Sequence, residues 1–482
     1  MIPVRAIART KTSVDPSVSY MANHLLRLRT ILLVTVATAA ALPVAAQAHT
    51  AQPTGSEADS WLAFLAETSS AQQSTATAPK AISSALPASQ GSQPNTILLP
   101  GLPRLSWNTI PLFRPADRPV RLRLGAEAQA DFGWIHAPSM EQLLQTDLDD
   151  RFQWRRLRPS IWAFIGDNTD LKAELELADG KGQIKDLFVR QRRMPWAGDL
   201  TIGHLKEPFS LEQLMSNTDI TFLERGLPNV LSPGRAFGGM LNDSALDDRV
   251  TWAAGLFRTV TASWADSSDE GDSLAFTGRT TWLPYYEQDG AQLVHLGAAY
   301  SYRAPQDTIK YDQRPEAHFT DFFTDTGDID AQHVNLLGTE AAWQDGPFSL
   351  QGQYLAAAVD SASAGDPFLD GLYVQGSYFL TGEHRPYDKH TGIFTSVQPL
   401  KDFLGPGGGL GAWEVAGRYS LLDLQAADLP SSARDMQDIT LGLNWYLTPN
   451  VRIGWNYIHS WVQGSDGEGA ADIFVMRLQV CF

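Results

Sequence analysis

The sequence predicts an all-β fold, a transmembrane antiparallel β-barrel of about sixteen strands with one constriction loop folded inward. Three observations support this prediction: an apolar alternation every two residues, an aromatic-rich composition, and connections of uneven length. The alternation is clearest in residues 471–482, where one face reads Phe474, Met476, Leu478, Val480 and Phe482. Arg477 and Gln479 lie on the other face. Because successive strand residues point to opposite faces, one face suits lipid and the other suits water.

Two segments before the final one repeat this pattern. Residues 439–447 (ITLGLNWYL) and 451–462 (VRIGWNYIHSWV) both alternate large apolar residues with small or polar ones. The three residues between them, TPN, leave room only for a hairpin turn. The polar, glycine-rich segment 464–469 predicts a looser loop at the opposite end. A soluble β-sandwich is the alternative fold, and aromatic outward faces on strands this long argue against it.

The composition favours a barrel over a helical membrane protein. The 482 residues include 14 Trp, 13 Tyr, 21 Phe and 39 Gly, yet only 43% are hydrophobic. Outer-membrane barrels have this composition because half of each strand faces water while Trp and Tyr gather at the two interfaces. Beyond the N-terminal export segment, no run of 18 or more apolar residues exists. A helical membrane protein is therefore excluded.

The first 48 residues have the features of an export signal. Arg27 and Arg29 precede an apolar run over residues 31–42, and the AQA sequence at 46–48 offers a cleavage site. Translation starts at Met1 or at Met21 in this interpretation. The run is too short to span a bilayer. We therefore expect export to the cell outer membrane of a Gram-negative-type bacterium, where the protein contacts outer-membrane lipid.

Three regions follow from these patterns. Residues 1–48 are the expected signal peptide, and residues 120–482 are the expected outer-membrane barrel. Between them, residues 49–119 are dominated by Ala, Ser, Thr, Gln and Pro, which predicts a low-complexity, mostly disordered N-terminal extension.

Charge and motif content limit the functions that the chain could have. Without residues 1–48 it keeps 32 basic and 53 acidic residues, a net charge of about −21, which argues against nucleic acid as a partner. The single cysteine, Cys481, excludes an internal disulfide. No histidine spacing predicts a metal site and no nucleophile motif predicts an enzyme. We expect neither a cofactor nor a catalytic residue.

Alternation continues with few interruptions from residue 120 to the end. The sixteen expected strands are 120–133, 152–166, 170–178, 183–193, 199–205, 235–243, 249–258, 272–283, 292–303, 333–344, 348–359, 370–381, 412–423, 437–447, 451–462 and 471–482. Short connections such as 166–169, 345–347 and 448–450 should face the periplasm, and longer ones such as 304–332 should face outward. The exception is 382–411, a long connection on the short-turn side. A barrel of this size encloses a water-filled lumen.

Basic residues occupy positions between the apolar ones on several strands. A lipid-facing arginine at mid-membrane costs about 2–4 kcal/mol, so these side chains should point into the lumen or lie near an interface. Inside the lumen they could attract anions. The strand candidates are Arg121, Arg123, Arg156, Arg158, Lys172, Arg190, Arg418, Arg452 and Arg477. The alternative is that they pair with lumen carboxylates such as Glu174, Glu176 and Asp186 and only brace the wall.

The connection 205–234 carries the most specific motifs. Residues 203–212 (GHLKEPFSLE) and 220–228 (ITFLERGLP) resemble segments of the phosphate-selective porin O and P family. Later segments, 376–387 (GSYFLTGEHRPY) and 411–420 (GAWEVAGRYS), are similar to further blocks of that family. The resemblance covers about residues 120–482.

The resemblance implies a sixteen-stranded, homotrimeric outer-membrane porin that passes small anions such as phosphate. It also implies that the connection 205–234 folds into the lumen. Lys206 and Arg225 lie in the matching segments and are the candidates nearest the narrowest zone. The alternative for both is an ion pair, with Glu207 and Glu224 respectively, that fixes the loop.

The leading hypothesis is thus a passive porin for anions, with phosphate or polyphosphate as the expected solutes. A less selective solute porin is the first alternative. A structural or adhesive barrel without transport is the second, and a single-channel recording distinguishes it from the other two.

Overall fold

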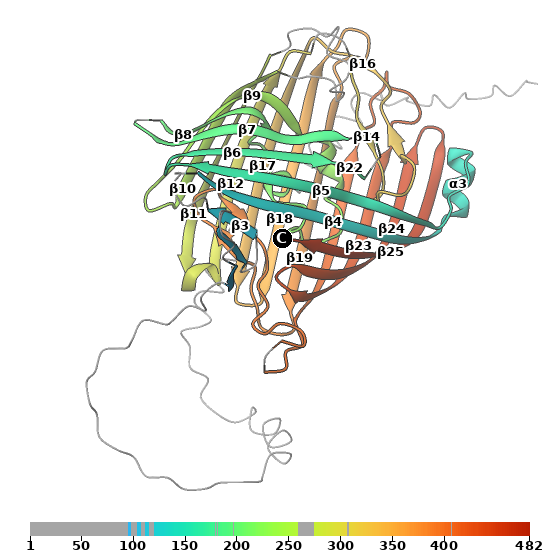
Figure 1. Cartoon of the computed structure of the whole chain (residues 1–482). Coiled ribbons are helices and arrows are strands. Elements are labelled where there is room, and N and C mark those ends of the chain that lie inside the picture. Colours follow the sequence, from blue (N-terminus) through green and yellow to red (C-terminus); the bar gives the residue numbers. More distant parts are fainter. Residues whose placement is uncertain are drawn as a thin grey trace, which may run out of the picture. The chain divides into compact units, whose positions relative to one another are not determined.

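The computed structural model describes residues 120–482, apart from 179, 181, 196, 259–273, 306–307 and 406, together with three short strands before them. Sixteen long strands form a barrel (Figure 1). The strands are β4 (Val120–His136), β5 (Arg151–Ile165), β6 (Thr169–Glu176), β7 (Gln183–Met194), β8 (Gly198–Lys206), β9 (Arg235–Ala245), β10 (Val250–Arg258), β11 (Leu274–Glu287), β12 (Gln292–Arg303), β17 (His333–Asp345), β18 (Phe348–Asp360), β19 (Phe368–Phe379), β22 (Ala412–Asp423), β23 (Asp435–Thr448), β24 (Val451–Gly464) and β25 (Gly467–Cys481).

The sheet closes on itself through its first and last long strands. β25 pairs antiparallel with β4, from Asp472 opposite His136 to Cys481 opposite Glu127. Backbone hydrogen bonds of 3.0 Å in both directions between Ala126 and Phe482 extend this pairing to the last residue. All other neighbouring strands of the barrel are also antiparallel. The predicted sixteen-stranded barrel is confirmed, and closure leaves no exposed sheet edge.

The strand boundaries differ from the prediction at the connection between β24 and β25. Residues 464–469 were expected to form a loose loop, but β24 continues to Gly464 and β25 begins at Gly467, so only two residues form the turn. Their pairing extends up to Gly464 opposite Gly467. Polar and glycine residues can continue a strand beyond the apolar belt, because there the outer face meets water rather than lipid.

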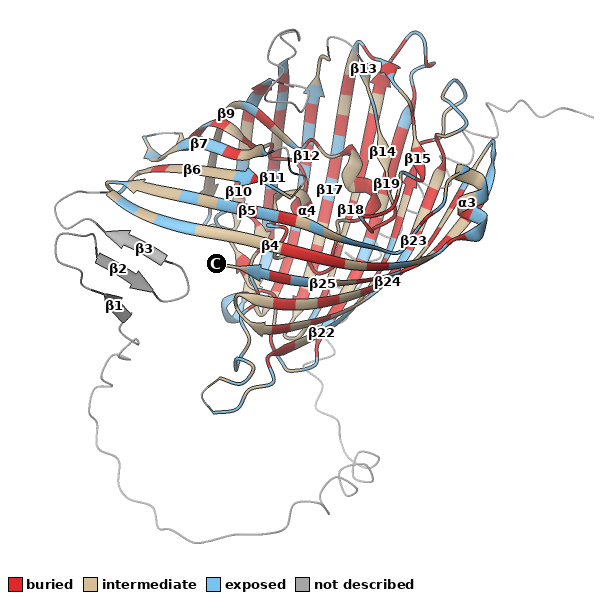
Figure 2. Ribbon diagram, turned by 45° about the vertical axis from the view of Figure 1, so that its right-hand side comes forward, coloured by how far each residue is buried: buried red, intermediate tan, exposed pale blue. Residues whose placement is uncertain are grey.

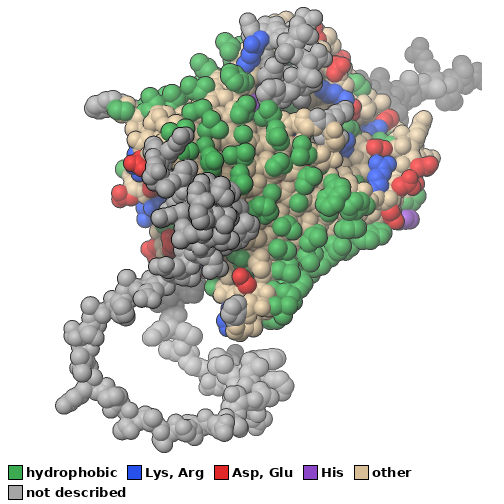
Figure 3. All heavy atoms as spheres, viewed as in Figure 1, with side chains coloured by type: hydrophobic (Ala, Val, Ile, Leu, Met, Phe, Trp, Pro, Cys, Tyr) green, Lys and Arg blue, Asp and Glu red, His purple; other side chains and the backbone are tan. Residues whose placement is uncertain are grey.

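The outer face of the barrel is apolar. Exposed large side chains on alternate positions of β4, β5, β7 and β25 include Trp134, Ile161, Val189, Phe474 and Leu478. The face drawn in Figure 3 carries hydrophobic side chains across its middle, while charged side chains gather toward the strand ends. This is the arrangement that a hydrocarbon core requires. Among the described residues no helix is long and apolar enough to cross a bilayer.

The predicted extension contributes short strands to the described structure: β1 (Asn95–Ile97), β2 (Arg104–Trp107) and β3 (Pro111–Arg114). Each pairs antiparallel with the next, and β3 pairs with the start of β4. The predicted signal peptide lies outside the described residues, and the division into three regions stays a prediction.

The connections alternate in length, as expected. Turns 166–168, 346–347 and 449–450 lie at one end of the barrel, called here the short-turn end. The opposite end carries the longer connections 137–150, 207–234 and 304–332, the first of which contains α3 (Pro138–Leu144). The long connection 380–411 lies at the short-turn end, where the sequence placed it. It contains the strand pair β20 (Tyr387–Asp388) and β21 (Ile393–Phe394).

Burial differs around the wall. Every second residue of β18, β19 and β24 is buried, and Figure 2 shows this alternation as red bands along the strands. On β5, β6 and β7 several residues of the lumen-facing set, such as Trp162, Lys172 and Arg190, stay partly exposed. The lumen is therefore packed along one side, and solvent reaches the other side.

A glycine on the wall makes room for one of the packed loops. A Cβ at Gly133 would lie 2.2 Å from the ring of Phe319, which belongs to the connection 304–332. Gly133→Val should therefore displace this connection, at a cost of about 1–3 kcal/mol from overpacking. Urea unfolding in lipid vesicles measures the cost, and adding Phe319→Ala should recover most of it. Equal destabilisation with and without Phe319→Ala would contradict this contact.

Candidate functional site

The connection 207–234, called here the inward loop, crosses the lumen. At its start Glu207 accepts hydrogen bonds from Arg303 of β12 and Thr277 of β11. Its short helix α4 (Leu211–Leu214) donates the Leu211 backbone N–H to Glu340 of β17 at 2.8 Å. Farther along, the Thr221 carbonyl oxygen accepts from Asn444 of β23. The loop thus spans from β11 to β23, and the predicted constriction loop is confirmed.

Two strand arginines hold the middle of the inward loop through its backbone. Arg452 donates to the carbonyl oxygens of Ile220, at 2.7 Å, and Thr221. Arg477 donates to the Leu223 carbonyl oxygen and, at 2.6 Å, to the Glu224 carboxylate. Carbonyl oxygens that a loop cannot pair internally need such donors when they are buried.

Glu224 is the point at which three guanidinium groups converge. Arg155 binds its carboxylate through two hydrogen bonds of 2.7 and 2.9 Å, while Arg156 and Arg477 approach it at 3.3 and 2.6 Å. Burial alone would raise the pKa of Glu224, but the three arginines hold it well below its usual range. The inward loop is thereby fastened to β5 and β25.

Two further connections enter the lumen and meet the inward loop. From the end opposite the short-turn end, Glu316 in the connection 304–332 binds Arg418. Arg418 also contacts Glu212 of the inward loop at 3.3 Å. From the short-turn end, Ser396 in 380–411 donates to Asp219 of the inward loop at 2.8 Å. All three connections therefore contribute to the packed side of the lumen.

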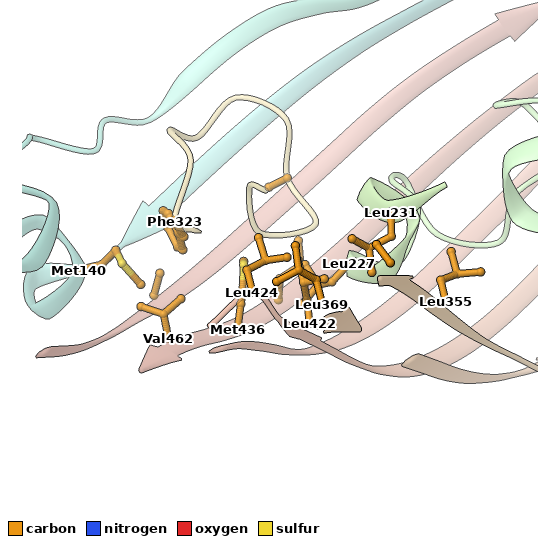
Figure 4. Close-up of a cluster of buried hydrophobic side chains, with 14 of the residues drawn as sticks. Met140, Leu227, Leu231, Phe323, Leu355, Leu369, Leu422, Leu424, Met436 and Val462 are labelled. Atoms are coloured by element: carbon orange, nitrogen blue, oxygen red, sulfur yellow. The ribbon is translucent and has the colours of Figure 1, made fainter. Parts of the chain in front are cut away.

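Apolar side chains complete this packing. Leu227 and Leu231, in the 3-10 turn η1 (Leu227–Leu231) of the inward loop, belong to one buried cluster with Leu355, Leu369 and Leu422 of the wall (Figure 4). Phe323, from the connection 304–332, belongs to the same cluster. Such burial favours a fixed position for the loops over a mobile one.

The eleven predicted pathway residues divide by their partners. Six are paired with carboxylates, and these are Arg156, Arg158, Lys172, Arg190, Arg418 and Arg477. Three donate only to carbonyl or amide oxygens in the described structure, and these are Lys206, Arg225 and Arg452. Arg121 and Arg123 are exposed and, within the described residues, have no ion-pair partner. The wall-bracing alternative thus describes the geometry of the first six, and the pathway role of all eleven stays a prediction.

Lys206 and Arg225 do not make the ion pairs considered for them. Lys206 donates to the carbonyl oxygens of Leu214 and Met215, at 3.1 and 2.8 Å, at the end of α4. Arg225 donates to the carbonyl oxygens of Glu212 and Met215. Burial lowers the pKa of Arg225 to about 10, so the side chain stays charged at neutral pH. Both side chains therefore have neutral oxygens as their hydrogen-bond partners at the inward loop, and Arg225 places a positive charge there.

Several contributors were not identified from the sequence. Arg155 is next to Arg156, so strict alternation would turn it outward, but a bulge opposite Gln129 and Ala130 brings both arginines to the lumen. Arg279 pairs with Glu340 at 2.6 Å and Arg235 pairs with Asp186 at 2.6 Å. Arg279 lies on the opposite alternate set of β11 from Phe276 and Trp282, and this alternation was the available sequence signal for it. No sequence signal indicated the bulge.

Acidification should leave the inward loop attached until about pH 4.5. The folded pKa of Glu224 lies below its unfolded value, so its contribution is present above the unfolded pKa and is lost as pH falls. Burial raises the pKa of Glu212, so protonation of this residue as pH falls removes the desolvation cost of its buried charge. Single-channel conductance should hold from pH 7 to about 4.5 and rise below it. A rise already between pH 7 and 5 would contradict this assignment.

Comparison with known proteins gives a consistent result. A family model described as phosphate-selective porin O and P matches residues 122–482. Porin O of Pseudomonas aeruginosa is 30% identical over 408 residues, which cover 76% of this chain and 89% of that protein. The chain belongs to the phosphate-selective porin O and P family. The resemblance inferred from residues 203–228 and 376–420 is confirmed.

Two further similarities accompany this assignment. An uncharacterised protein of Caulobacter vibrioides is 28% identical to this porin over 366 residues, 73% of this chain and 71% of that protein. A loop L8 deletion mutant of OmpT, an outer membrane protein of Vibrio cholerae, is 12% identical and has a TM-score of 0.48. The match covers 75% of this porin and 99% of that chain. The family and the barrel together place this porin in the outer membrane, as a channel protein.

Proposed function

We propose that this porin passes small anions, phosphate or polyphosphate among them, by passive diffusion along the accessible wall of β4–β7. The observation that supports the proposal most directly is the pair Arg121 and Arg123, which are exposed and without a carboxylate partner among the described residues. Both lie on the lumen-facing set of β4 that includes Asp131, which binds Arg477. Guanidinium groups can replace part of an anion's hydration while binding weakly enough for release.

The acidic total of the chain does not oppose this proposal, because net charge does not locate charges. Six pathway candidates already have carboxylate partners. Arg225 adds positive charge at the inward loop. An anion moving along the wall would therefore meet separated positive sites rather than a continuous basic lining.

The paired state of those six cations also favours a second candidate function, a less selective porin for small solutes. Paired charges cancel at a distance, which reduces discrimination between anions and neutral molecules. Liposome swelling distinguishes the two functions. Swelling in neutral sugars as fast as in phosphate salts would favour the less selective porin.

Replacing Arg121 and Arg123 together with glutamine should reduce anion preference. Their loss removes two of the accessible positive charges, so the anion-to-cation permeability ratio should fall about threefold. Stability should change by less than about 0.5 kcal/mol because both side chains are exposed. The zero-current potential under a salt gradient measures the ratio, and phosphate block of the chloride current should weaken in parallel.

The matched control is Arg193→Gln, which removes an exposed arginine at the end of β7. It should leave the permeability ratio unchanged. A ratio that is equally insensitive to Arg121→Gln/Arg123→Gln would remove the support for this wall as the anion path.

We also propose a homotrimer, which the family implies. Light scattering of the porin in detergent, with the detergent mass subtracted, should give three times the mass of one exported chain. A monomeric mass at protein concentrations that still give channel activity would contradict the homotrimer.

A further inference from the structure

A group of three aromatic rings lies on the accessible wall near the short-turn end. Trp162 and Phe164 of β5 stack with ring centroids 6.1 Å apart and an angle of 10° between their planes. Phe188 of β7 meets Trp162 edge-on at 5.9 Å. All three are partly exposed. We call these three side chains the aromatic patch.

The strand register places the aromatic patch inside the barrel. Arg158 and Arg156 occupy the same alternate set of β5 as Trp162 and Phe164, and Arg156 reaches Glu224 of the inward loop. The intervening residue Ile161 is 46% exposed on the opposite face, where lipid lies. Residues that are paired across strands share a face, and Lys172 pairs with both Trp162 and Phe188.

Cationic groups surround these rings. Arg121 and Arg123 each place the guanidinium carbon 5.4 Å from the centre of the Phe164 ring. Lys172 and Arg190 lie 5.4 and 5.8 Å from the Trp162 ring. The two pairs differ, because Lys172 and Arg190 are bound to carboxylates, whereas Arg121 and Arg123 have no carboxylate partner among the described residues. Within the described part of the chain, two guanidinium groups beside the aromatic patch therefore have no carboxylate that competes with a ligand.

Simple conduction of inorganic anions does not require this combination. An aromatic ring facing a water-filled path exposes apolar surface without benefit to a small hydrated anion. A ring-bearing anion would gain from both parts, because its ring could stack on the aromatic patch while its anionic group bound the guanidinium fork. Stacking of rings on aromatic side chains is a recurrent source of affinity that tolerates different ring types.

We propose that the aromatic patch, with Arg121 and Arg123, is a binding subsite for organic phosphate monoesters that carry an aromatic ring. The inference rests on the proposed anion path and adds a substrate class to it. In this arrangement the ring lies against Trp162 and Phe164, and the phosphate binds Arg121 and Arg123. The alternative is that the rings only pack against the aliphatic parts of the arginine side chains.

The test compares two probes on the full-length porin in planar bilayers. Phenyl phosphate and inorganic phosphate are each titrated against the chloride current. Phenyl phosphate should reach half-block at about a tenfold lower concentration than inorganic phosphate. Equal half-block concentrations in the unmodified porin would overturn the inference, and this result needs no variant.

A pair of variants shows where the ring of phenyl phosphate binds. Trp162→Ala should reduce the phenyl phosphate advantage to about twofold or less, whereas Trp154→Ala should retain it. Trp154 belongs to the same strand but is 56% exposed on the outer face. An advantage that survives Trp162→Ala would place ring binding elsewhere and overturn the inference. If neither phosphate probe blocks and cations carry the current, the proposed function fails instead.

Discussion

Glu224→Gln should make the porin markedly more selective for anions. The carboxylate is the common partner of Arg155, Arg156 and Arg477, with contacts of 2.6–3.3 Å. A neutral amide leaves their positive charges with one counter-charge fewer beside the lumen. The anion-to-cation permeability ratio should rise about threefold or more. The zero-current potential under a salt gradient measures this rise.

The same substitution should weaken the attachment of the inward loop. Removing one partner from a buried ion pair costs about 3–5 kcal/mol, and the 15% exposure of Glu224 places the expected loss at the lower end. Single-channel conductance should rise as the loop loosens. Adding Arg155→Gln should recover part of both effects, since Arg155 makes the two-point contact with the carboxylate.

Glu468→Gln is the matched control for Glu224→Gln. Glu468 is an exposed carboxylate near the start of β25, so its loss should change neither selectivity nor stability. A shift toward cations in Glu224→Gln, or no shift at all, would contradict the convergence of three guanidinium groups on this residue.

Arg418→Met should release two of the loops that pack into the lumen. The Arg418 side chain binds Glu316 of the connection 304–332, and it also binds Glu212 and the Glu224 carbonyl oxygen of the inward loop. Methionine keeps most of the apolar volume but leaves two buried carboxylates without their cation. Such a loss costs about 3–5 kcal/mol. Urea unfolding should show it, and single-channel conductance should increase.

Neutralising the two carboxylates tests the cause of this loss. Arg418→Met combined with Glu212→Gln and Glu316→Gln should be more stable than Arg418→Met alone. Arg249→Met is the matched control, because Arg249 donates only to the carbonyl oxygens of Leu283 and Tyr286 in the described structure. If Arg249→Met and Arg418→Met destabilise the porin equally, the junction of the two loops has no special role.

Alternation in the sequence was enough to predict the barrel. Lipid on one face and water on the other force a period of two, so the inward direction of Arg452 and Arg477 could be inferred from their neighbours. The same rule could not place Arg155, because a bulge changes the period for one residue and leaves no mark in composition. Strand ends were less certain for a related reason: beyond the hydrocarbon core both faces meet water.

The contacts inside the lumen could not be predicted in this way. Glu316 lies in a connection without periodicity, and its binding to Arg418 joins positions 102 residues apart. Motif resemblance placed Lys206 and Arg225 at the loop but did not give their partners, which are backbone carbonyl oxygens and, for Arg225, also the amide oxygen of Asn217. Which cations remain without carboxylates depends on how three loops pack together, and only the structure shows that packing.

The proposed anion path runs along a wall on which positive charges remain available. The most direct measurement is the zero-current potential of a single porin channel with a tenfold KCl gradient across a planar bilayer. A preference for anions should bring this potential close to the equilibrium value for chloride. A potential close to the equilibrium value for potassium would contradict it.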